Sequence, residues 1–260
     1  MSKEIPAYPP GRGLLEDRSV LVTAAAGAGI GFATARRCAE EGARVMISDI
    51  HERRLGEAAD ELEKATGTRP PTRLCNVTRE GEVRSLVDSA LERFGHLDVL
   101  VNNAGLGGTA HVVDMSDEQW SSVLDVTLTG AFRMTRAVLP HMMERGEGCI
   151  VNNASVLGWR AQAGQAHYAA AKAGVMALTR CTAAEAAGAG VRVNAVSPSL
   201  ATHPFLEKVM DADLLRRMEG EEMFGRGAAP FEVANVIVFL ASDLASYMTG
   251  EIVSVSSQHP

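Results

Sequence analysis

The sequence lacks the features that define several large classes of protein. No apolar stretch in its 260 residues reaches the roughly 18 to 20 residues needed to cross a bilayer. The net charge is −7 and no lysine- and arginine-rich run is present, so nothing predicts nucleic-acid binding through phosphate contacts. The four cysteines show no CxxC spacing and the seven histidines no HExxH spacing, so we expect neither a disulfide framework nor a metal site. These absences predict a cytoplasmic protein without a membrane or nucleic-acid partner.

The start of the chain differs from the rest. Its first 13 residues, MSKEIPAYPPGRG, contain three prolines and no apolar core, which is not the pattern of a secretory signal. We expect residues 1–17 to form a flexible or surface-docked leader. The remaining length is too short for two comfortable domains, so residues 18–260 should form one α/β catalytic domain.

Within that domain, short apolar segments alternate with longer amphipathic ones. Several of the short segments are continuously apolar, which is typical of strands covered on both faces. The pattern predicts a single doubly wound Rossmann-type domain, with a parallel seven-stranded sheet and helices on both faces. The expected strands are Val20–Ala24, Arg44–Ser48, Thr72–Cys75, Val99–Asn102, Cys149–Asn153, Val191–Val196 and Glu251–Val255. The expected helices are Ile30–Glu41, Glu52–Ala65, Glu80–Phe94, Asp117–Arg145, His167–Ala187 and Phe231–Ala241.

One segment, residues 199–229, is longer than this alternation requires. It lies between the sixth expected strand and the last expected helix. Ligands of doubly wound folds bind beyond the carboxyl ends of the strands, so the segment is a candidate lid over a substrate. A helical hairpin packed for stability is the alternative. Its apolar residues are Phe205, Leu206, Val209, Leu214, Leu215 and Met218.

A glycine-rich loop, AAAGAGIG, joins the first expected strand to the first expected helix. Glycines let the backbone approach a pyrophosphate, and a helix N-terminus presents unpaired N–H groups and a positive dipole end to it. The loop therefore predicts a bound dinucleotide, contacted by Thr23, Gly27, Gly29, Ile30 and Gly31.

Asp49 ends the second expected strand, eighteen residues after Gly31. A carboxylate there accepts hydrogen bonds from the ribose hydroxyls of adenosine and repels a 2′-phosphate, which favours NAD over NADP. Asp49 as a cap for the following helix is the alternative interpretation. Arg53 and Arg54 are the nearby residues that could serve a 2′-phosphate instead.

Three residues predict hydride chemistry. Tyr168 and Lys172 are four residues apart on one expected helix and so share a face, and Ser155 directly follows a strand. Reduction of a carbonyl leaves an alkoxide that needs a proton. A phenol with an ordinary pKa near 10 can supply it more readily when a lysine ammonium lowers that pKa. A serine hydroxyl polarises the carbonyl. We predict Ser155, Tyr168 and Lys172 as the catalytic core, with Tyr168 as general acid and base.

From about Arg18 to Val255 the sequence resembles the short-chain dehydrogenase/reductase family. The resemblance rests on the glycine loop, Asp49, Ser155, the run Asn102-Asn103-Ala104-Gly105, the segment Tyr168-Ala-Ala-Ala-Lys172 and the segment Asn194-Ala-Val-Ser-Pro198. It implies an NAD-dependent enzyme that interconverts a small-molecule alcohol and a ketone, assembled as a homodimer or homotetramer through the helices at 117–145 and 167–187. It also implies further cofactor contacts, at Asn76, Val77, Asn102, Asn103, Ala104, Gly105 and Pro198.

The sequence departs from the family pattern at several positions. Ala24 stands where the family has glycine, and the stretch to Gly31 is one residue longer. Asn76 replaces an aspartate, with an amide that can both accept and donate a hydrogen bond. Thr127 replaces the fourth catalytic residue, an asparagine that holds a proton-relaying water, and we predict that its hydroxyl takes that role.

Four further stretches, LVTAAAGAGIG, SDIHERRLGE, NNASVLGWRAQ and YMTGEIVSVSSQ, are similar to an actinobacterial branch that degrades the sterol C and D rings. That resemblance implies oxidation of a ring hydroxyl on a bicyclic coenzyme A thioester. Two other functions stay open: an NADPH-dependent 3-oxoacyl reductase, and a dinucleotide-sensing scaffold without turnover. Candidate contacts for coenzyme A phosphates are Lys208, Arg216, Arg217 and Arg226.

Overall fold

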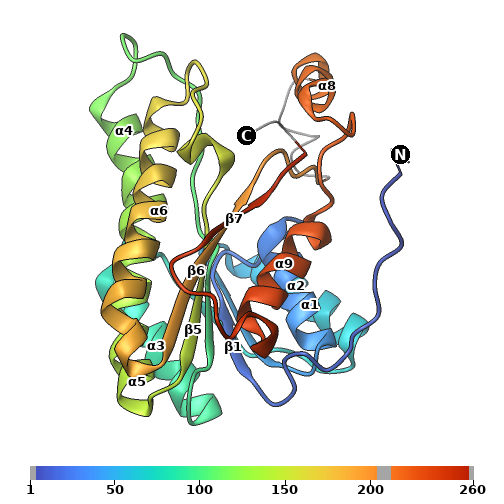
Figure 1. The fold of residues 1–260 in the computed structure, drawn as a ribbon, viewed down its shortest axis with the longest axis vertical. Helices are drawn as coiled ribbons and strands as arrows, with labels where there is room; N and C mark the ends of the chain where they lie inside the picture. The colour runs from blue at the N-terminus through green and yellow to red at the C-terminus, as the bar shows by residue number, and fades with distance from the viewer. Residues whose placement is uncertain (1–3, 204–211, 258–260) are drawn as a thin grey trace.

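The computed structural model describes residues 4–203 and 212–257, and seven parallel strands form one sheet in it (Figure 1). The sheet order is β3-β2-β1-β4-β5-β6-β7, so the predicted fold class is confirmed. Each strand overlaps its predicted range, with ends that differ by one or two residues. The strands are β1 (Ser19–Val22), β2 (Arg44–Asp49), β3 (Thr72–Leu74), β4 (Val99–Asn102), β5 (Gly148–Asn153), β6 (Val191–Pro198) and β7 (Ile252–Val255).

Two layers of helices enclose the sheet (Figure 1). One face is covered by α1 (Ile30–Glu40), α2 (Glu52–Thr66) and α9 (Pro230–Ala241). The other is covered by α3 (Glu80–Phe94), α4 (Asp117–Leu124), α5 (Gly130–Arg145) and α6 (Ala166–Ala186). Helix α8 (Ala212–Glu221) stands beyond the carboxyl edge of the sheet, and short turns occur at Asp125–Thr129, Val156–Gly158, Ala187–Ala189 and Asp243–Ala245.

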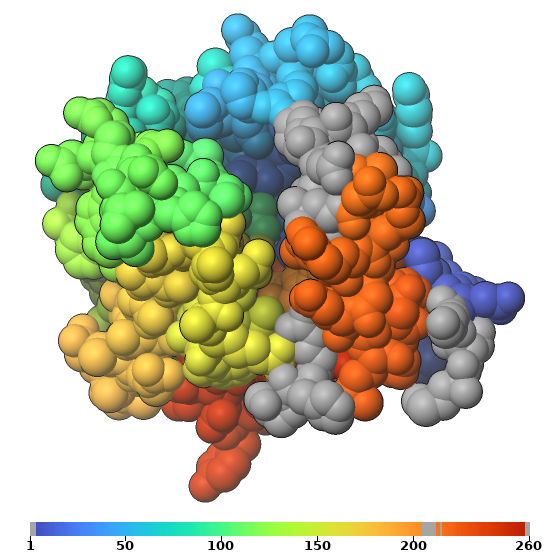
Figure 2. All heavy atoms as spheres, turned by 90° about the horizontal axis from the view of Figure 1, so that it is seen from above, coloured from blue at the N-terminus to red at the C-terminus, as the bar shows by residue number. Residues whose placement is uncertain are grey.

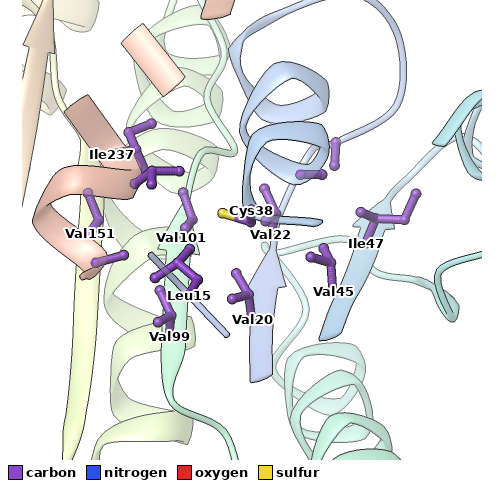
Figure 3. Close-up of a cluster of buried hydrophobic side chains, with 14 of the residues drawn as sticks. Leu15, Val20, Val22, Cys38, Val45, Ile47, Val99, Val101, Val151 and Ile237 are labelled. Atoms are coloured by element: carbon purple, nitrogen blue, oxygen red, sulfur yellow. The ribbon is translucent and has the colours of Figure 1, made fainter. Parts of the chain in front are cut away.

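The strands bury side chains on both faces, as their continuous apolar runs predict. In β1, Val20 and Val22 belong to the cluster under α1 and α9 (Figure 3). Leu21 belongs to the cluster on the opposite face of the sheet. All three are fully buried. Burying such a side chain contributes about 1.5–3 kcal/mol, so the register of this central strand is strongly fixed. The loops that leave its carboxyl end therefore start from a rigid base.

The helix predicted over 117–145 is interrupted. A π-helical turn, Asp125–Thr129, separates α4 from α5. Such a turn inserts one residue into the helix and rotates the side chains that follow. Thr127 lies in this turn and is buried, with 1% of its surface exposed. The interruption thus turns Thr127 inward, towards the carboxyl edge of β4.

The described part of the leader lies along α1. The Tyr8 hydroxyl donates a 2.5 Å hydrogen bond to Glu40, and the Tyr8 ring meets the ring of Phe231 edge-on at 5.1 Å. Glu41 is buried, accepts the backbone N–H groups of Arg12 and Leu14 at 2.7 and 3.1 Å, and pairs with the buried Arg37. These contacts tie the leader to the last turn of α1.

Two general properties complete the fold. Among the described residues, no helix has both the length and the apolar character needed to cross a membrane. The four cysteines are free thiols, with Cys38, Cys75 and Cys149 buried and Cys181 exposed.

Candidate active site

The loops after β1 and β4 leave the carboxyl edge of the sheet side by side, at the point where strand order reverses. Thr23 joins them: its hydroxyl accepts the N–H groups of Asn103 and Ala104 at 3.0 and 3.1 Å and donates to the Val101 carbonyl at 3.3 Å. The Asn103 amide donates in turn to the carbonyls of Thr23 and Ala24 at 3.2 and 3.0 Å. These predicted dinucleotide contacts therefore form one cross-linked platform.

The glycine loop has the backbone that its sequence requires. A Cβ at Gly31 would overlap the Ala24 carbonyl and the Asn103 amide, so only glycine fits where α1 meets the loop. Gly27 has a φ of 101° and Ala24 a φ of 50°. The left-handed region costs an alanine about 1–2 kcal/mol. The loop thus keeps, at Ala24, a conformation suited to the glycine of the family.

Asp49 is buried beside this loop, at the end of β2. Its carboxylate accepts the N–H of Ala26 at 3.1 Å and the N–H of His51, the residue before α2, also at 3.1 Å. Burial raises the pKa of the Asp49 carboxyl, against the opposing effects of the Ala26 N–H and the Arg54 charge. Asp49 therefore orders both the dinucleotide loop and the start of α2, and its contact with a ribose stays a prediction.

Asn76 uses its side chain differently from the prediction. Its carbonyl oxygen accepts the N–H and the hydroxyl of Thr78 at 3.0 and 2.8 Å, which closes the turn after β3. The amide N–H groups are left to donate, whereas the carbonyl is already occupied. The neighbouring Val77 is buried against Gly130 at the start of α5.

Asn102 and Asn103 point in opposite directions. Asn102 is buried, and its amide donates to Thr135 of α5 at 3.1 Å and to Asn152 of β5 at 2.9 Å. Asn103 lines the cleft described below and accepts the Asn153 amide at 2.9 Å. The structure therefore places Asn103, and not the side chain of Asn102, beside the predicted cofactor.

Ser155, Tyr168 and Lys172 meet at the carboxyl edge. Ser155 follows β5, is hydrogen-bonded to Tyr168, and accepts the N–H of Leu157 at 3.2 Å. The Lys172 ammonium lies 5.5 Å from the centre of the Tyr168 ring and donates to the Asn153 carbonyl at 2.6 Å. The spatial arrangement expected from the spacing of the three residues is thus present.

Burial dominates the electrostatics of these groups. It raises the pKa of the Tyr168 phenol, and the hydrogen bond with Ser155 opposes that rise. It also lowers the pKa of Lys172 to about 8. The direction for Tyr168 is opposite to the lowering expected from the ammonium, because burial of the phenol outweighs other influences and the ammonium is directed at the Asn153 carbonyl.

Thr127 contacts the loop after β4. Its hydroxyl accepts the N–H of Leu106 at 3.0 Å and donates to the Leu106 carbonyl at 3.3 Å. A Cβ at Gly105 would lie 3.6 Å from the Lys172 nitrogen and 3.8 Å from the Thr127 oxygen, so both groups face the same narrow space. Thr127 thus holds this loop through Leu106, and the second lone pair of its hydroxyl stays available, so its water-holding role stays a prediction.

A cleft of ≈ 750 Å³ opens beside Ser155, Tyr168 and Lys172. Figure 2 looks down on this edge and shows a hollow between the yellow segment after β5 and the orange α8. Asn103 and Gly105 line its cofactor side. A second cavity, of ≈ 430 Å³, lies near the amino end of β2, and no predicted site residue lines it.

Comparison with known proteins assigns this architecture. Residues 24–257 match the family model described as enoyl-(acyl carrier protein) reductase. The chain is 61% identical, over 96% of both chains, to the (5R,7aS)-5-hydroxy-7a-methyl-1-oxo-2,3,5,6,7,7a-hexahydro-1H-indene-carboxyl-CoA reductase of Mycobacterium tuberculosis. It is 41% identical to a 3-oxoacyl-[acyl-carrier-protein] reductase of Thermotoga maritima, over 93% of this chain and 97% of that one. A short-chain dehydrogenase structure from Mycobacterium smegmatis shares 56% identity, 99% coverage of both chains and a TM-score of 0.88.

The chain belongs to the short-chain dehydrogenase/reductase family. It is therefore an oxidoreductase that acts on CH–OH and carbonyl groups with a nicotinamide dinucleotide. The bound nicotinamide supplies or accepts the hydride. Ser155, Tyr168 and Lys172, the residues predicted to handle the substrate oxygen and its proton, line one cleft.

The segment predicted as a lid, residues 199–229, is described only in part. Phe205, Leu206, Lys208 and Val209 lie outside the described residues. Met218 and Glu221 of α8 line the cleft opposite the segment after β5. Helix α8 is therefore placed to border a substrate.

The basic residues proposed for coenzyme A phosphates differ in availability. Arg226 forms an ion pair with Glu232 at 2.7 Å, and Arg216 pairs with Asp213. Of the described candidates, Arg217 is exposed and has no hydrogen bond or ion pair with another described residue. Among the described candidates, Arg217 is thus the most available to a phosphate.

Some functional positions were missed from the sequence. One such position is Asn153, whose carbonyl accepts a hydrogen bond from Lys172. Its place at the end of a strand, just before Ser155, is the sequence signal that could have identified it. Thr109, Gln162 and Gln165 of the cleft wall are others. Pro198 was predicted, and it ends β6 next to the cleft residue Ser199.

Proposed function

We propose that this enzyme interconverts a secondary alcohol and a ketone on the ring of a steroid-derived bicyclic coenzyme A thioester, with NAD as its cofactor. The observation that carries the proposal is the 61% identity, over 96% of both chains, to a reductase whose name specifies an indene-carboxyl coenzyme A thioester. The catalytic Ser155, Tyr168 and Lys172 stand in a cleft that opens to the surface.

The lining of the cleft is compatible with a fused apolar ring system. Val156 and Leu157 border it on one side, and Leu200 and Met218 on the other. Its volume of ≈ 750 Å³ falls within the range of small-molecule sites, which bury most of a ligand against apolar walls. These four side chains would give a bicyclic ring system apolar contacts.

The preference for NAD rests on Asp49. Its carboxylate is buried at the end of β2, beside the dinucleotide loop, where a 2′-phosphate would meet a negative charge. Of the two alternative partners for such a phosphate, Arg53 is paired with Glu57 at 2.7 Å, whereas the charge of Arg54 acts on Asp49 itself. This ion pair reduces the attraction available to NADP.

A cofactor and substrate panel tests the proposal. Absorbance at the NADH band is followed with the bicyclic coenzyme A thioester, a linear 3-oxoacyl coenzyme A and a free steroid alcohol, each with NAD(H) and NADP(H). We expect the highest kcat/KM for the bicyclic thioester with NAD(H). Asp49→Asn should reduce the preference for NAD about tenfold, the effect of removing roughly 1.4 kcal/mol of charge repulsion.

A second candidate function is an NADPH-dependent 3-oxoacyl reductase, favoured by the 41% identity to the Thermotoga maritima enzyme. Higher kcat/KM for linear 3-oxoacyl thioesters with NADPH would establish it and would contradict the first proposal. A sensing scaffold predicts dinucleotide binding without turnover in the same panel. The proposed assembly, a homodimer or homotetramer through α4, α5 and α6, is measured by analytical ultracentrifugation.

A further inference from the structure

The residues just before α6 form hydrogen bonds with the loop that follows β4. The Gln165 amide nitrogen donates to the Gly108 carbonyl at 2.8 Å and to the Thr109 hydroxyl at 3.1 Å. The backbone N–H of Ala110 donates to the Gly164 carbonyl at 3.0 Å. Together these contacts fix the wall of the cleft that Thr109 and Gln165 line.

The orientation of the Gln165 amide follows from its partners. The Gly108 carbonyl can only accept, so the NH₂ end of the amide must face it and the oxygen must point elsewhere. Both N–H groups are then used by the loop. The carbonyl oxygen, Oε1, makes no hydrogen bond within the part of the chain that the structure describes, and Gln165 lines the cleft. The protein thus holds a fixed acceptor on the cleft wall.

This acceptor lies near the reacting group. Gln165 directly precedes α6, and Tyr168 is three residues later, on the same side of the helix. A ketone substrate has no donor at its reacting end, and the hydroxyl of an alcohol is engaged by Ser155 and Tyr168. A donor for Gln165 must therefore come from another part of the substrate. Gln165 is partly buried, so an N–H group of a bound substrate would replace water at this oxygen.

We propose that Gln165 Oε1 accepts a hydrogen bond from an amide N–H in the carrier arm of an acyl thioester, and so selects pantetheine-type thioesters over simple ones. The inference rests on the proposed function, because it takes the substrate to be a thioester. Among the parts of such a substrate, the amide groups of the arm are the N–H donors nearest the acyl chain. Gln165 is thereby a specificity-determining residue rather than a catalytic one.

Two matched substrates test the inference. The same keto acid is prepared as the N-acetylcysteamine thioester, which carries one amide N–H, and as the S-ethyl thioester, which carries none. The wild-type protein should favour the first in kcat/KM. Gln165→Met, which keeps the length of the side chain without its amide, should lower kcat/KM for that substrate about tenfold more than for the second, chiefly through KM.

A control variant separates recognition of the substrate amide from the hydrogen bonds that hold the loop after β4. Thr109→Val removes the hydroxyl that accepts one of the two Gln165 hydrogen bonds but keeps Gln165 Oε1. The preference for the amide-bearing thioester should therefore persist. NADH affinity, measured by fluorescence titration, should be equal in the three proteins.

Three results would overturn the inference. An equal loss for both thioesters in Gln165→Met would show that Gln165 only holds the loop. Equal kcat/KM for the two substrates in the wild-type protein would show that the arm is not recognised. Failure of the wild-type protein to turn over either thioester would refute the proposed function, and the inference with it. This result differs from failure of the inference alone, because it is seen in the wild-type protein before any substitution is made.

Discussion

Replacing Tyr168 by phenylalanine tests the proposed proton transfer most directly. The change removes one oxygen and keeps the ring, which is flanked by Ser155 and Lys172. The Ser155 hydroxyl loses one hydrogen bond but still accepts the N–H of Leu157. The fold and the dinucleotide platform should therefore be unaffected, and an effect on rate can be assigned to the lost hydroxyl.

The expected magnitude follows from the role of a general acid. A positioned proton donor accelerates such reactions about 10²–10⁴-fold, so kcat should fall by that factor. Burial raises the pKa of Tyr168, so the phenol is protonated at neutral pH and ready to donate in ketone reduction. KM should change little, since substrate binding depends on the rest of the cleft.

Steady-state absorbance of NADH measures kcat, and fluorescence titration of NADH measures binding in the same variant. Tyr247→Phe is the matched control, because Tyr247 is fully exposed and lies outside the cleft. It should keep wild-type kcat. Activity of Tyr168→Phe within a few-fold of wild type, with NADH still bound, would refute the mechanism.

Three further predictions concern other parts of the molecule. Gly31→Ala should weaken NADH binding at least tenfold in fluorescence titration, because its Cβ overlaps the Ala24 carbonyl. The control Gly56→Ala, with open space around its Cβ, should bind NADH normally. Unchanged affinity in Gly31→Ala would contradict the close approach of the backbone at this position. Burial lowers the pKa of Lys172 from 10.5 to about 8, so between these values the unfolded chain binds more protons and stability rises with pH. Between pH 7 and pH 10.5 the free energy of unfolding, measured in urea, should therefore rise by about 3 kcal/mol more in the wild-type protein than in Lys172→Met. An equal rise in the two proteins would show that the folded lysine stays charged. Glu41→Ala removes one ion-pair partner of the buried Arg37, which keeps Glu40 at 3.3 Å, and leaves the N–H groups of Arg12 and Leu14 without their acceptor. It should cost about 1–3 kcal/mol in denaturant unfolding, against less than about 1 kcal/mol for Glu57→Ala in an exposed pair; equal losses would contradict the stabilising role assigned to the buried Glu41.

The sheet was predictable because its strands are buried on both sides. Val20, Leu21 and Val22 in succession have no amphipathic alternative, so a covered strand is the structure that hides all three. The catalytic residues were predictable for a related reason: a spacing of four in a helix fixes a shared face, and the end of a parallel strand fixes an edge.

The details that depend on tertiary contacts were not predictable. The π turn that interrupts the helix after α4 brings Thr127 to Leu106, a residue 21 positions earlier in the chain, and no local pattern marks it. The opposite directions of Asn102 and Asn103, by contrast, were predictable from strand alternation, because Asn102 points to the same face of the sheet as Leu100, the face covered by α5. The pKa directions depend on how deeply the groups are buried, which the spacing of residues does not give.

The contact between Tyr8 and Phe231 has a consequence for biosynthesis. During translation Tyr8 leaves the ribosome early, but its partner is synthesised more than two hundred residues later. The amino-terminal end can engage Glu40 and Glu41 as soon as that stretch is helical, yet it completes its packing only when α9 has docked. The first part of the polypeptide to be made is thus among the last to settle.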